Sequence, residues 1–206
     1  MAKANTEALI LLPSLFRAFE VFLRRHIMLA RRSTLDVDLT AGVEIQHLTI
    51  GFVDLVDSTA LAQELSTADL AAALTAFESL VADTVTDHGA RVVKLIGDEV
   101  MYCAANPLTA CRIALVLTDA LLTHRVLPPA RSGIAVGAVM CRDGDCFGPV
   151  VNLAARAVKI ARPGRIVVSA EVSAAVREAL GSTPLPPIRL KGFDGETELF
   201  EVYERA

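Results

Sequence analysis

The chain has 206 residues, of which 53% are hydrophobic and 21% are charged, which suits one domain with a full core plus an appendage and is short for two. Its formal net charge of -4 lacks the basic character that duplex nucleic acid requires, so no nucleic-acid partner is expected. The four cysteines show neither a CxxC pair nor histidines at ligand spacing, which argues against a zinc site or a disulfide framework and indicates reduced thiols in a cytoplasmic protein.

The N-terminal part predicts an amphipathic helix over residues 6–32, followed by the polar stretch "STLDVDLTAG", which is typical of a linker. The apolar run of this helix is interrupted by Arg17, Glu20, Arg24, Arg25 and His26. Because no uninterrupted run of spanning length remains, a membrane span is not expected. Packing on a partner helix is favoured, with a membrane-surface helix as the alternative. The chain is therefore divided into a helix and linker, 1–45, and a main domain, 46–206.

The main domain opens with the β-branched run "QHLTIGFVDL", which predicts a buried strand, and one helix is expected from residue 58 to Gly89. The runs "ARVVKLI" and "EVMYCAA" predict a hairpin that turns at Gly97 and Asp98. The remaining predicted elements are a helix over 107–123, a strand "GIAVGAVMC", a turn "RDGD", a helix over 149–160, a strand "RIVVS", a helix "AEVSAAVREALG", and final strands "IRLKG" and "ETELFEVY". This order predicts an α+β fold in which helices cover one face of a mainly antiparallel sheet.

Two aspartates stand where predicted strands end. Asp54 follows the strand "TIGFV", and Asp98 lies at the turn of the hairpin, so neighbouring strands are expected to bring both carboxylates to one sheet edge. Two carboxylates without a cation repel each other, and a divalent metal ion removes that repulsion. Mg²⁺ takes one or two carboxylates together with phosphates and water, and two such ions assist phosphoryl displacement.

Both aspartates also have a structural interpretation, in which Asp54 caps a helix and Asp98 is an ordinary turn residue. Of the neighbouring acids, Glu99 is expected only to flank the site. Asp57 is the better candidate for the helix cap, because Ser58 opens the predicted helix beside it.

Three segments, "FVDLVDST", "KLIGDEVM" and "GDCFGPVVNLAAR", together resemble the catalytic domain of class III nucleotidyl cyclases, and "DCFGPVVN" is similar to the mycobacterial-type adenylyl cyclases. The resemblance spans residues 46–204. It implies a ferredoxin-like βαββαβ sheet with helices on one face plus C-terminal additions, a homodimer with sites at the subunit interface, and conversion of ATP to 3′,5′-cyclic AMP and pyrophosphate. One departure is "DLVDST", which has Asp57 where many members have glycine and Ser58 where they have an aromatic residue.

By motif match, Asp54 and Asp98 resemble the two aspartates that bind two divalent cations, Mg²⁺ or Mn²⁺, and Lys94 and Asp145 resemble the pair that binds the purine. Adenine offers an acceptor at N1 and a donor at N6, so Lys94 donates to N1 and Asp145 accepts from N6. Guanine presents the reverse polarity, so this pair is expected to select ATP over GTP. The structural alternatives are a lysine lying along a strand edge and an aspartate in a turn.

Asn152 and Arg156 resemble the residues that steady the ribose and the α-phosphate, and Lys191 in "RLKGFDGE" resembles a basic residue that contacts the triphosphate. Asn152 and Arg156 are four positions apart on the predicted helix, so they share a face. An exposed helix-surface pair is the alternative interpretation. The guanidinium of Arg156 suits phosphate oxygens whose charge grows during the reaction, and its removal is expected to cost about 3 kcal/mol of barrier, roughly a hundredfold in rate.

The implied reaction needs no protein nucleophile, because the ribose 3′-hydroxyl of the substrate attacks the α-phosphate. In the implied homodimer, each composite site takes the metal-binding aspartates from one subunit and the purine-, ribose- and phosphate-binding groups from its partner. The main alternative is a catalytically silent, cyclase-like module for regulatory dimerisation or nucleotide binding. A different two-metal enzyme, such as a palm-type polymerase or a diguanylate cyclase, ranks lower because the chain has no "GGDEF"-like run.

Overall fold

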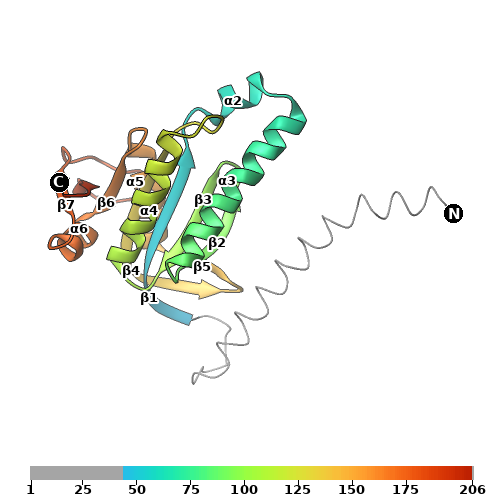
Figure 1. Ribbon diagram of the computed structural model, residues 1–206. Coiled ribbons are helices and arrows are strands. Elements are labelled where there is room, and N and C mark those ends of the chain that lie inside the picture. The colour runs from blue at the N-terminus through green and yellow to red at the C-terminus, as the bar shows by residue number, and fades with distance from the viewer. Residues whose placement is uncertain (1–43, 206) are drawn as a thin grey trace. The chain divides into compact units, whose positions relative to one another are not determined.

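The computed structural model describes residues 44–205, apart from the side chains at positions 59 and 62 (Figure 1). The helix predicted over residues 6–32 and its linker lie outside the described residues, and the division of the chain into 1–45 and 46–206 stays a prediction. None of the helices within 44–205 is long and apolar enough to cross a membrane.

One eight-stranded sheet runs through the described residues, in the order β2-β3-β1-β4-β6-β8-β7, with β5 paired to β4. The strands are β1 (Glu44–Leu55), β2 (Arg91–Ile96), β3 (Glu99–Ala104), β4 (Ala130–Arg142), β5 (Asp145–Phe147), β6 (Ile166–Ser169), β7 (Gly181–Pro184) and β8 (Leu199–Tyr203). The β4–β6 pair is parallel and the other strand pairs are antiparallel. The sheet is therefore mainly antiparallel, as predicted.

The helices of the described residues are α2 (Ser58–Glu64), α3 (Thr67–Asp87), α4 (Pro107–Leu122), α5 (Pro149–Ile160) and α6 (Ala170–Val176). Proline occupies the first turn of α4 and of α5, where its missing N–H costs no hydrogen bond. Strands β1 to β4 with α3 and α4 between them give the βαββαβ order of a ferredoxin-like unit, which confirms the predicted fold class.

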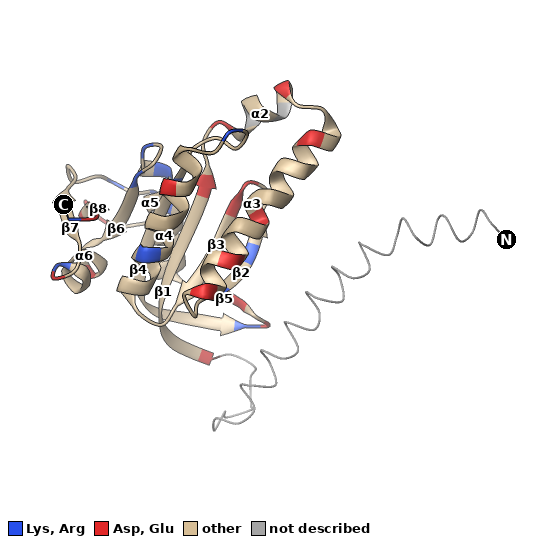
Figure 2. Ribbon diagram, viewed as in Figure 1, with Lys and Arg blue, Asp and Glu red and all other residues tan. Residues whose placement is uncertain are grey.

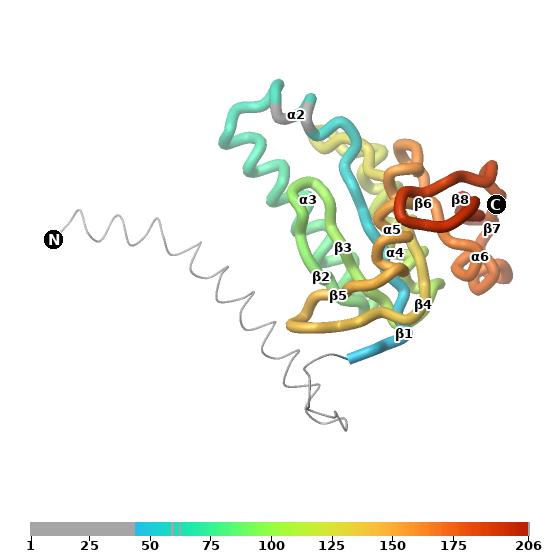
Figure 3. Tube along the Cα trace, turned by 180° about the vertical axis from the view of Figure 1, so that it is seen from behind, coloured from blue at the N-terminus to red at the C-terminus, as the bar shows by residue number. Residues whose placement is uncertain are grey.

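The two faces of the sheet carry separate hydrophobic cores. Alternation along β1 sends Val53 and Leu55 into the core shared with α3 and α4, and sends Ile50 and Phe52 into the core shared with α5. Figure 1 shows α3 and α4 across the near face, and Figure 3 shows the same sheet from behind, with α5 against it. The two helices of the ferredoxin-like unit thus cover one face, and α5, one of the C-terminal additions, covers the other.

Helix α5 lies close against β4 at Gly133. A Cβ atom at this position would lie 2.1 Å from the backbone nitrogen of Val158 and 2.4 Å from the carbonyl oxygen of Ala154, distances that no real side chain adopts. Only glycine lets the two backbones approach this closely. The contact fixes the position of α5 on the sheet, and with it the positions of the polar side chains that α5 carries.

The single helix predicted after β1 is wrong, because the chain divides there into α2 and α3. Leu65 is extended, and the side chain of Ser66 accepts a hydrogen bond from the backbone N–H of Asp69, which starts a new helix. At the far end of α3, Gly89 has φ +69°, the left-handed conformation typical of a residue that follows a helix.

The C-terminal region differs from the prediction in two strands. The predicted strand "IRLKG" contributes only an isolated bridge between Ile188 and Thr197. Strand β8 is already paired with β6 on one side and with β7 on the other, so neither of its edges is open to this segment. The sequence reading missed β7, and it also missed β5, which follows directly after the "RDGD" turn.

All four cysteines are buried, as expected for core thiols. Burial raises the pKa of the Cys111 thiol to about 12. Cys141 and Cys146 face each other across the β4–β5 pair, with their sulfur atoms 3.8 Å apart.

Candidate active site

The end of β1 and the turn between β2 and β3 border a polar pocket of about 530 Å³, called the acidic pocket below. Its polar lining includes Asp54, Asp57, Ser58, Asp98, Arg131 and Lys159. The backbone N–H of Leu55 donates to the carbonyl oxygen of Asp98 at 3.2 Å, which ties the turn to the end of β1. The structure thus brings both predicted metal-binding aspartates to one pocket, and Figure 2 shows acidic and basic residues from several elements meeting near the arrowhead of β1.

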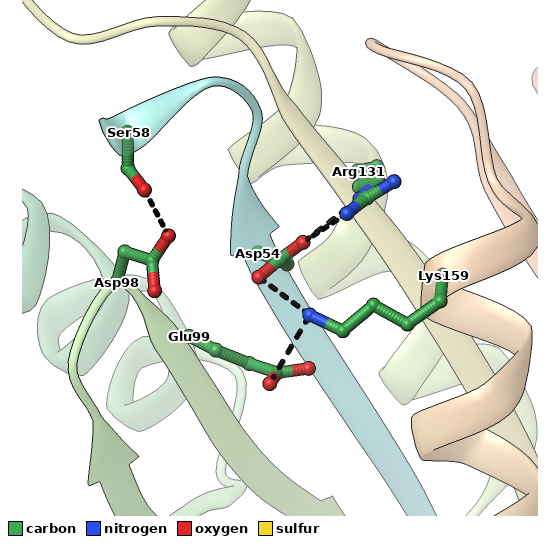
Figure 4. A network of polar contacts seen from close by, with 6 residues as sticks. All are labelled: Asp54, Ser58, Asp98, Glu99, Arg131 and Lys159. Atoms are coloured by element: carbon green, nitrogen blue, oxygen red, sulfur yellow. Dashed lines mark hydrogen bonds and ion pairs between the residues drawn. The ribbon is translucent and has the colours of Figure 1, made fainter. Parts of the chain in front are cut away.

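Asp54 is only 3% exposed, and each of its carboxylate oxygens contacts a cation (Figure 4). Arg131 donates to Oδ2 through Nε at 2.8 Å, and its Nη2 lies 2.7 Å from the same oxygen. Lys159 of α5 donates to Oδ1 through Nζ at 2.9 Å. A carboxylate this deeply buried requires such partners, because burial without them would disfavour its charge.

Lys159 also reaches Glu99, with its Nζ 3.4 Å from Oε2. The other oxygen of Glu99, Oε1, is buried and has no hydrogen-bond partner among the described residues. Burial raises the pKa of Glu99, and the neighbouring ammonium of Lys159 partly opposes that rise. Glu99 is therefore linked to Asp54 through Lys159, although it does not itself line the acidic pocket. Its role as a residue that only flanks the site stays a prediction.

Asp98 is held from the other side of the acidic pocket, where the hydroxyl of Ser58 donates a short hydrogen bond to its Oδ2 (Figure 4). Asp57 stands at the N-cap position of α2 as predicted, but its side chain makes no capping hydrogen bond. Its φ of 57° lies in the left-handed region, which favours glycine. This conformation gives a physical reason for the glycine that many class III cyclases carry at the matching position.

Lys94 and Asp145 meet away from the acidic pocket and are called the purine pair below. Lys94 Nζ donates to Asp145 Oδ2 at 2.9 Å and lies 5.7 Å from the ring centre of Phe147. The other carboxylate oxygen, Oδ1, accepts the backbone N–H of Cys146 at 2.7 Å, which fixes the orientation of the carboxylate. Asp145 is the first residue of the short strand β5 and pairs with Arg142 directly across the turn at Asp143 and Gly144.

Asn152 and Arg156 lie on α5 as predicted, and both are exposed. Their side chains make no hydrogen bond or ion pair with other residues of the described chain, and neither lines the acidic pocket. Lys191 is also exposed, in the turn before β8. Within one chain, the structure therefore keeps these three residues and the purine pair apart from the lining of the acidic pocket.

The family model described as "Adenylate and Guanylate cyclase catalytic domain" matches residues 42–203, which is most of the chain. The chain belongs to this family. The catalytic-domain resemblance inferred from the three sequence segments is thus confirmed.

Relatives with longer sequences support the assignment. An uncharacterized protein of Mycobacterium tuberculosis is 36% identical over 98% of this chain and 53% of its own length. An adenylate cyclase of Streptomyces coelicolor is 42% identical over 60% of this chain and 32% of its own length. A pH-sensitive adenylate cyclase of Mycobacterium tuberculosis is 34% identical over 76% of this chain and 41% of its own length. The cyclase chain thus spans about half the length, or less, of these relatives.

Solved structures show the same fold. The catalytic core of a rhodopsin-guanylyl cyclase with converted specificity, in complex with ATPαS, has a TM-score of 0.74 at 22% identity and covers 80% of this chain and 99% of its own. The adenylyl cyclase CyaB of P. aeruginosa has a TM-score of 0.72 at 20% identity, covering 80% and 97%.

The cyclase family uses divalent metal ions, and the residues of the acidic pocket fit such a group. Within residues 44–205, no group of three or more His, Cys, Asp or Glu side chains is arranged to hold a metal ion. Mg²⁺, however, takes one or two protein carboxylates and completes its shell with substrate phosphates and water. Asp54 and Asp98 supply that number of hard oxygen ligands. Glu99 is the cross-strand partner of Asp54, and its buried Oε1 has no hydrogen-bond partner within residues 44–205.

The sequence did not point to two cations that line the acidic pocket, Arg131 and Lys159. Arg131 is the direct cross-strand partner of Asp54 in the β1–β4 pair, and Glu99 is its partner in the β1–β3 pair. Side chains at paired positions project from the same face, so the register alone would have identified both neighbours. Lys159 follows Arg156 by three positions on α5, and that spacing was the available signal.

Proposed function

We propose that this cyclase domain converts ATP to 3′,5′-cyclic AMP and pyrophosphate, as a homodimer with composite sites between its subunits. The observation that carries the choice of ATP is the purine pair, in which a lysine donor and a carboxylate acceptor lie side by side at 2.9 Å. Relatives that bear the name adenylate cyclase support the same choice. We further expect the domain to act in the cytoplasm.

The purine pair suits adenine because each of its two groups matches one atom of the base. Lys94 donates to N1, and Asp145 accepts from the N6 amino group. Without a base, the two side chains satisfy each other at a half-exposed position. A guanine base would place its N1–H donor against the Lys94 donor and its O6 acceptor against the Asp145 acceptor, and the lost hydrogen bonds disfavour GTP.

The acidic pocket would hold two divalent cations, Mg²⁺ or Mn²⁺, through Asp54 and Asp98. When bound, these ions supply the charge that activates the ribose 3′-hydroxyl and stabilises the leaving pyrophosphate. The chain contributes rigid ligands: Arg131 orients Asp54, and Ser58 orients Asp98. Preorganisation of this kind lowers the cost of binding the triphosphate in a reactive geometry.

The exposed face of α5 would complete the site of the partner subunit. Asn152 would hold the ribose, and Arg156 would present its planar fork of donors to the α-phosphate as charge develops there. Lys191 would contact the triphosphate. The acidic pocket lacks these residues and the purine pair within one chain, which supports a composite site that two chains would assemble around one nucleotide.

The test is to incubate the purified chain with ATP or with GTP, in Mg²⁺ or in Mn²⁺, and to identify the product by mass. We expect cyclic AMP from ATP and little cyclic GMP from GTP. Asp54→Ala is expected to abolish formation of cyclic AMP, while the exposed, surface-helix variant Asp119→Ala retains it. Undiminished activity of Asp54→Ala would remove the metal mechanism, and no cyclic nucleotide from the unmodified chain would favour the catalytically silent module.

A further inference from the structure

We infer that Lys159 is a positioning residue whose ammonium serves as the counter-ion of Asp54 and Glu99 until a divalent cation displaces it. The inference rests on the metal role proposed above for Asp54. Lys159 thereby weakens the binding of a divalent cation to the protein when no nucleotide is present.

The carboxylate of Asp54 already has cationic partners. Both oxygens of this buried carboxylate are engaged by cations, Oδ2 by Arg131 and Oδ1 by Lys159. A metal ion that binds Asp54 therefore binds an oxygen that already has a cationic partner, and the two positive charges repel each other there. The free energy of that exchange enters the metal affinity.

The contacts of the two cations differ, and this difference determines which of them leaves Asp54 when a metal ion binds. Arg131 contacts Oδ2 through two nitrogens, at 2.8 and 2.7 Å, and its side chain is 25% exposed. Lys159 contacts Oδ1 through one nitrogen at the end of a flexible stem, and its side chain is 47% exposed. A planar fork with two contacts loses less freedom on binding than a single ammonium, so Lys159 is the partner released into solvent.

The ammonium of Lys159 contacts two carboxylates at once. Figure 4 shows Nζ of Lys159 between the carboxylates of Asp54 and Glu99. Lys159 also lines the acidic pocket together with Asp98. A positive charge at this point repels an incoming cation and also satisfies the carboxylates that would bind it. Its removal leaves Arg131 as the one remaining cation among the described residues that line the acidic pocket.

The fold keeps Lys159 available for this exchange. Helix α5 packs against β4 at Gly133 through the backbone of Ala154 and Val158. Asn152 and Arg156 of the same helix are exposed. The backbone of Lys159 therefore stays beside the acidic pocket, and only the side chain moves when its carboxylate partners change.

The first experiment measures Mn²⁺ binding to the full chain at low ionic strength without nucleotide, from the electron paramagnetic resonance signal of free Mn²⁺. Lys159→Gln is expected to bind Mn²⁺ about three- to tenfold more tightly than the unmodified chain, the range that loss of one half-exposed competing charge gives. Lys159→Arg, which restores the charge, is expected to reverse the gain. Arg162→Gln is the matched control, because it removes an exposed charge just beyond α5 that pairs with Glu201 instead.

The same measurement in an Asp54→Asn background separates this inference from the proposed function. If Lys159 acts through Asp54, the gain from Lys159→Gln disappears there. A gain that persists in that background, or equal affinities of Lys159→Gln and the unmodified chain, would overturn the inference. If Asp54→Asn itself leaves Mn²⁺ binding unchanged, the proposed metal site fails as well.

A second experiment uses the unmodified chain, so it does not depend on how a variant folds. Surface lysines are acetylated with and without Mn²⁺, and the extent of labelling at each position is read by mass spectrometry. Lys159 is expected to react about threefold faster with Mn²⁺, because its ammonium has left the two carboxylates. Lys94, held by Asp145 in the purine pair, is the internal control and should not change. Equal labelling of Lys159 while Mn²⁺ binds would contradict the inference.

Discussion

The acidic pocket and the purine pair use opposite charges in different ways. In the acidic pocket, the side chain of Asp54 is 5% exposed and has two cationic partners, one on strand β4 and one on helix α5, both far from it in the sequence. In the purine pair, Lys94 and Asp145 are 37% and 33% exposed at their side chains and contact each other in a single ion pair. Burial makes the charges of the first region essential to its structure, whereas those of the second region remain available to a ligand.

The difference follows from what each region would bind. Metal ions and a triphosphate would require fixed ligands, and Arg131 and Ser58 orient the carboxylates of Asp54 and Asp98 in advance. A purine base is neutral, and it is selected by matched hydrogen bonds. Under the proposed function, the purine pair therefore needs only a lysine and a carboxylate that would exchange their mutual contact for contacts to the base.

The largest expected effect tests whether the acidic pocket is catalytic. Asp98→Asn keeps the size of the side chain and its hydrogen bond from Ser58, but removes a charge that would bind metal. We expect kcat for cyclic AMP formation to fall by about a hundredfold to a thousandfold, as for loss of one electrostatic stabiliser of a transition state. Asp119→Asn, an exposed acid on α4, is the control. If both variants kept full kcat, the catalytic role of the acidic pocket would be refuted.

A stability measurement tests the difference in burial directly. Arg131→Met leaves the buried Asp54 with Lys159 as its one remaining cationic partner within the described residues, so the free energy of unfolding is expected to fall by about 2 to 3 kcal/mol. Lys94→Met breaks the half-exposed purine pair and should cost at most about 1 kcal/mol. Urea unfolding of both variants gives the two values. Equal losses would show that the two regions do not differ in how their charges support the fold.

The purine pair is tested by its selectivity. Lys94→Glu replaces the donor for adenine N1 with an acceptor, which suits the N1–H of guanine. The ratio of kcat/KM for ATP to that for GTP is expected to fall at least about tenfold, which corresponds to the loss of one hydrogen bond to a buried base atom. Metal affinity should not change, because Lys94 does not line the acidic pocket. An unchanged ratio would remove Lys94 from base recognition.

Much of this arrangement followed from the sequence because local patterns encode it. The βαββαβ order, the hairpin turn at Gly97 and Asp98, and the start of α5 at Pro149 each depend on residues near one another in the chain. The convergence of Asp54 and Asp98 also followed, since adjacent strands end at the same edge. These features need no knowledge of the strand register.

The features that the sequence reading missed depend on long-range pairing. Arg131 and Glu99 become neighbours of Asp54 only once β1 is paired with β4 and β3 in a definite register, and one residue of shift would send them to the other face. Lys159 reaches Asp54 because α5 packs on the face to which Asp54 points, a packing choice that the helical period does not specify. The same applies to "IRLKG", whose pairing was prevented by strands elsewhere in the sheet.

The smallest expected effect concerns the rim of the acidic pocket, at Asp57. Its φ of 57° costs a residue with a side chain about 1 kcal/mol, and glycine avoids this cost but loses about 0.5 to 1 kcal/mol of backbone entropy on folding. Asp57→Gly is therefore expected to leave the free energy of unfolding nearly unchanged, whereas Asp57→Ala should lower it by about 1 kcal/mol, since alanine tolerates the left-handed region less well than aspartate. Urea unfolding of both variants gives the comparison. If alanine proved as stable as glycine, the left-handed backbone would not be what selects the residue here, and the charge that Asp57 adds to the acidic pocket would become the better reason for its presence.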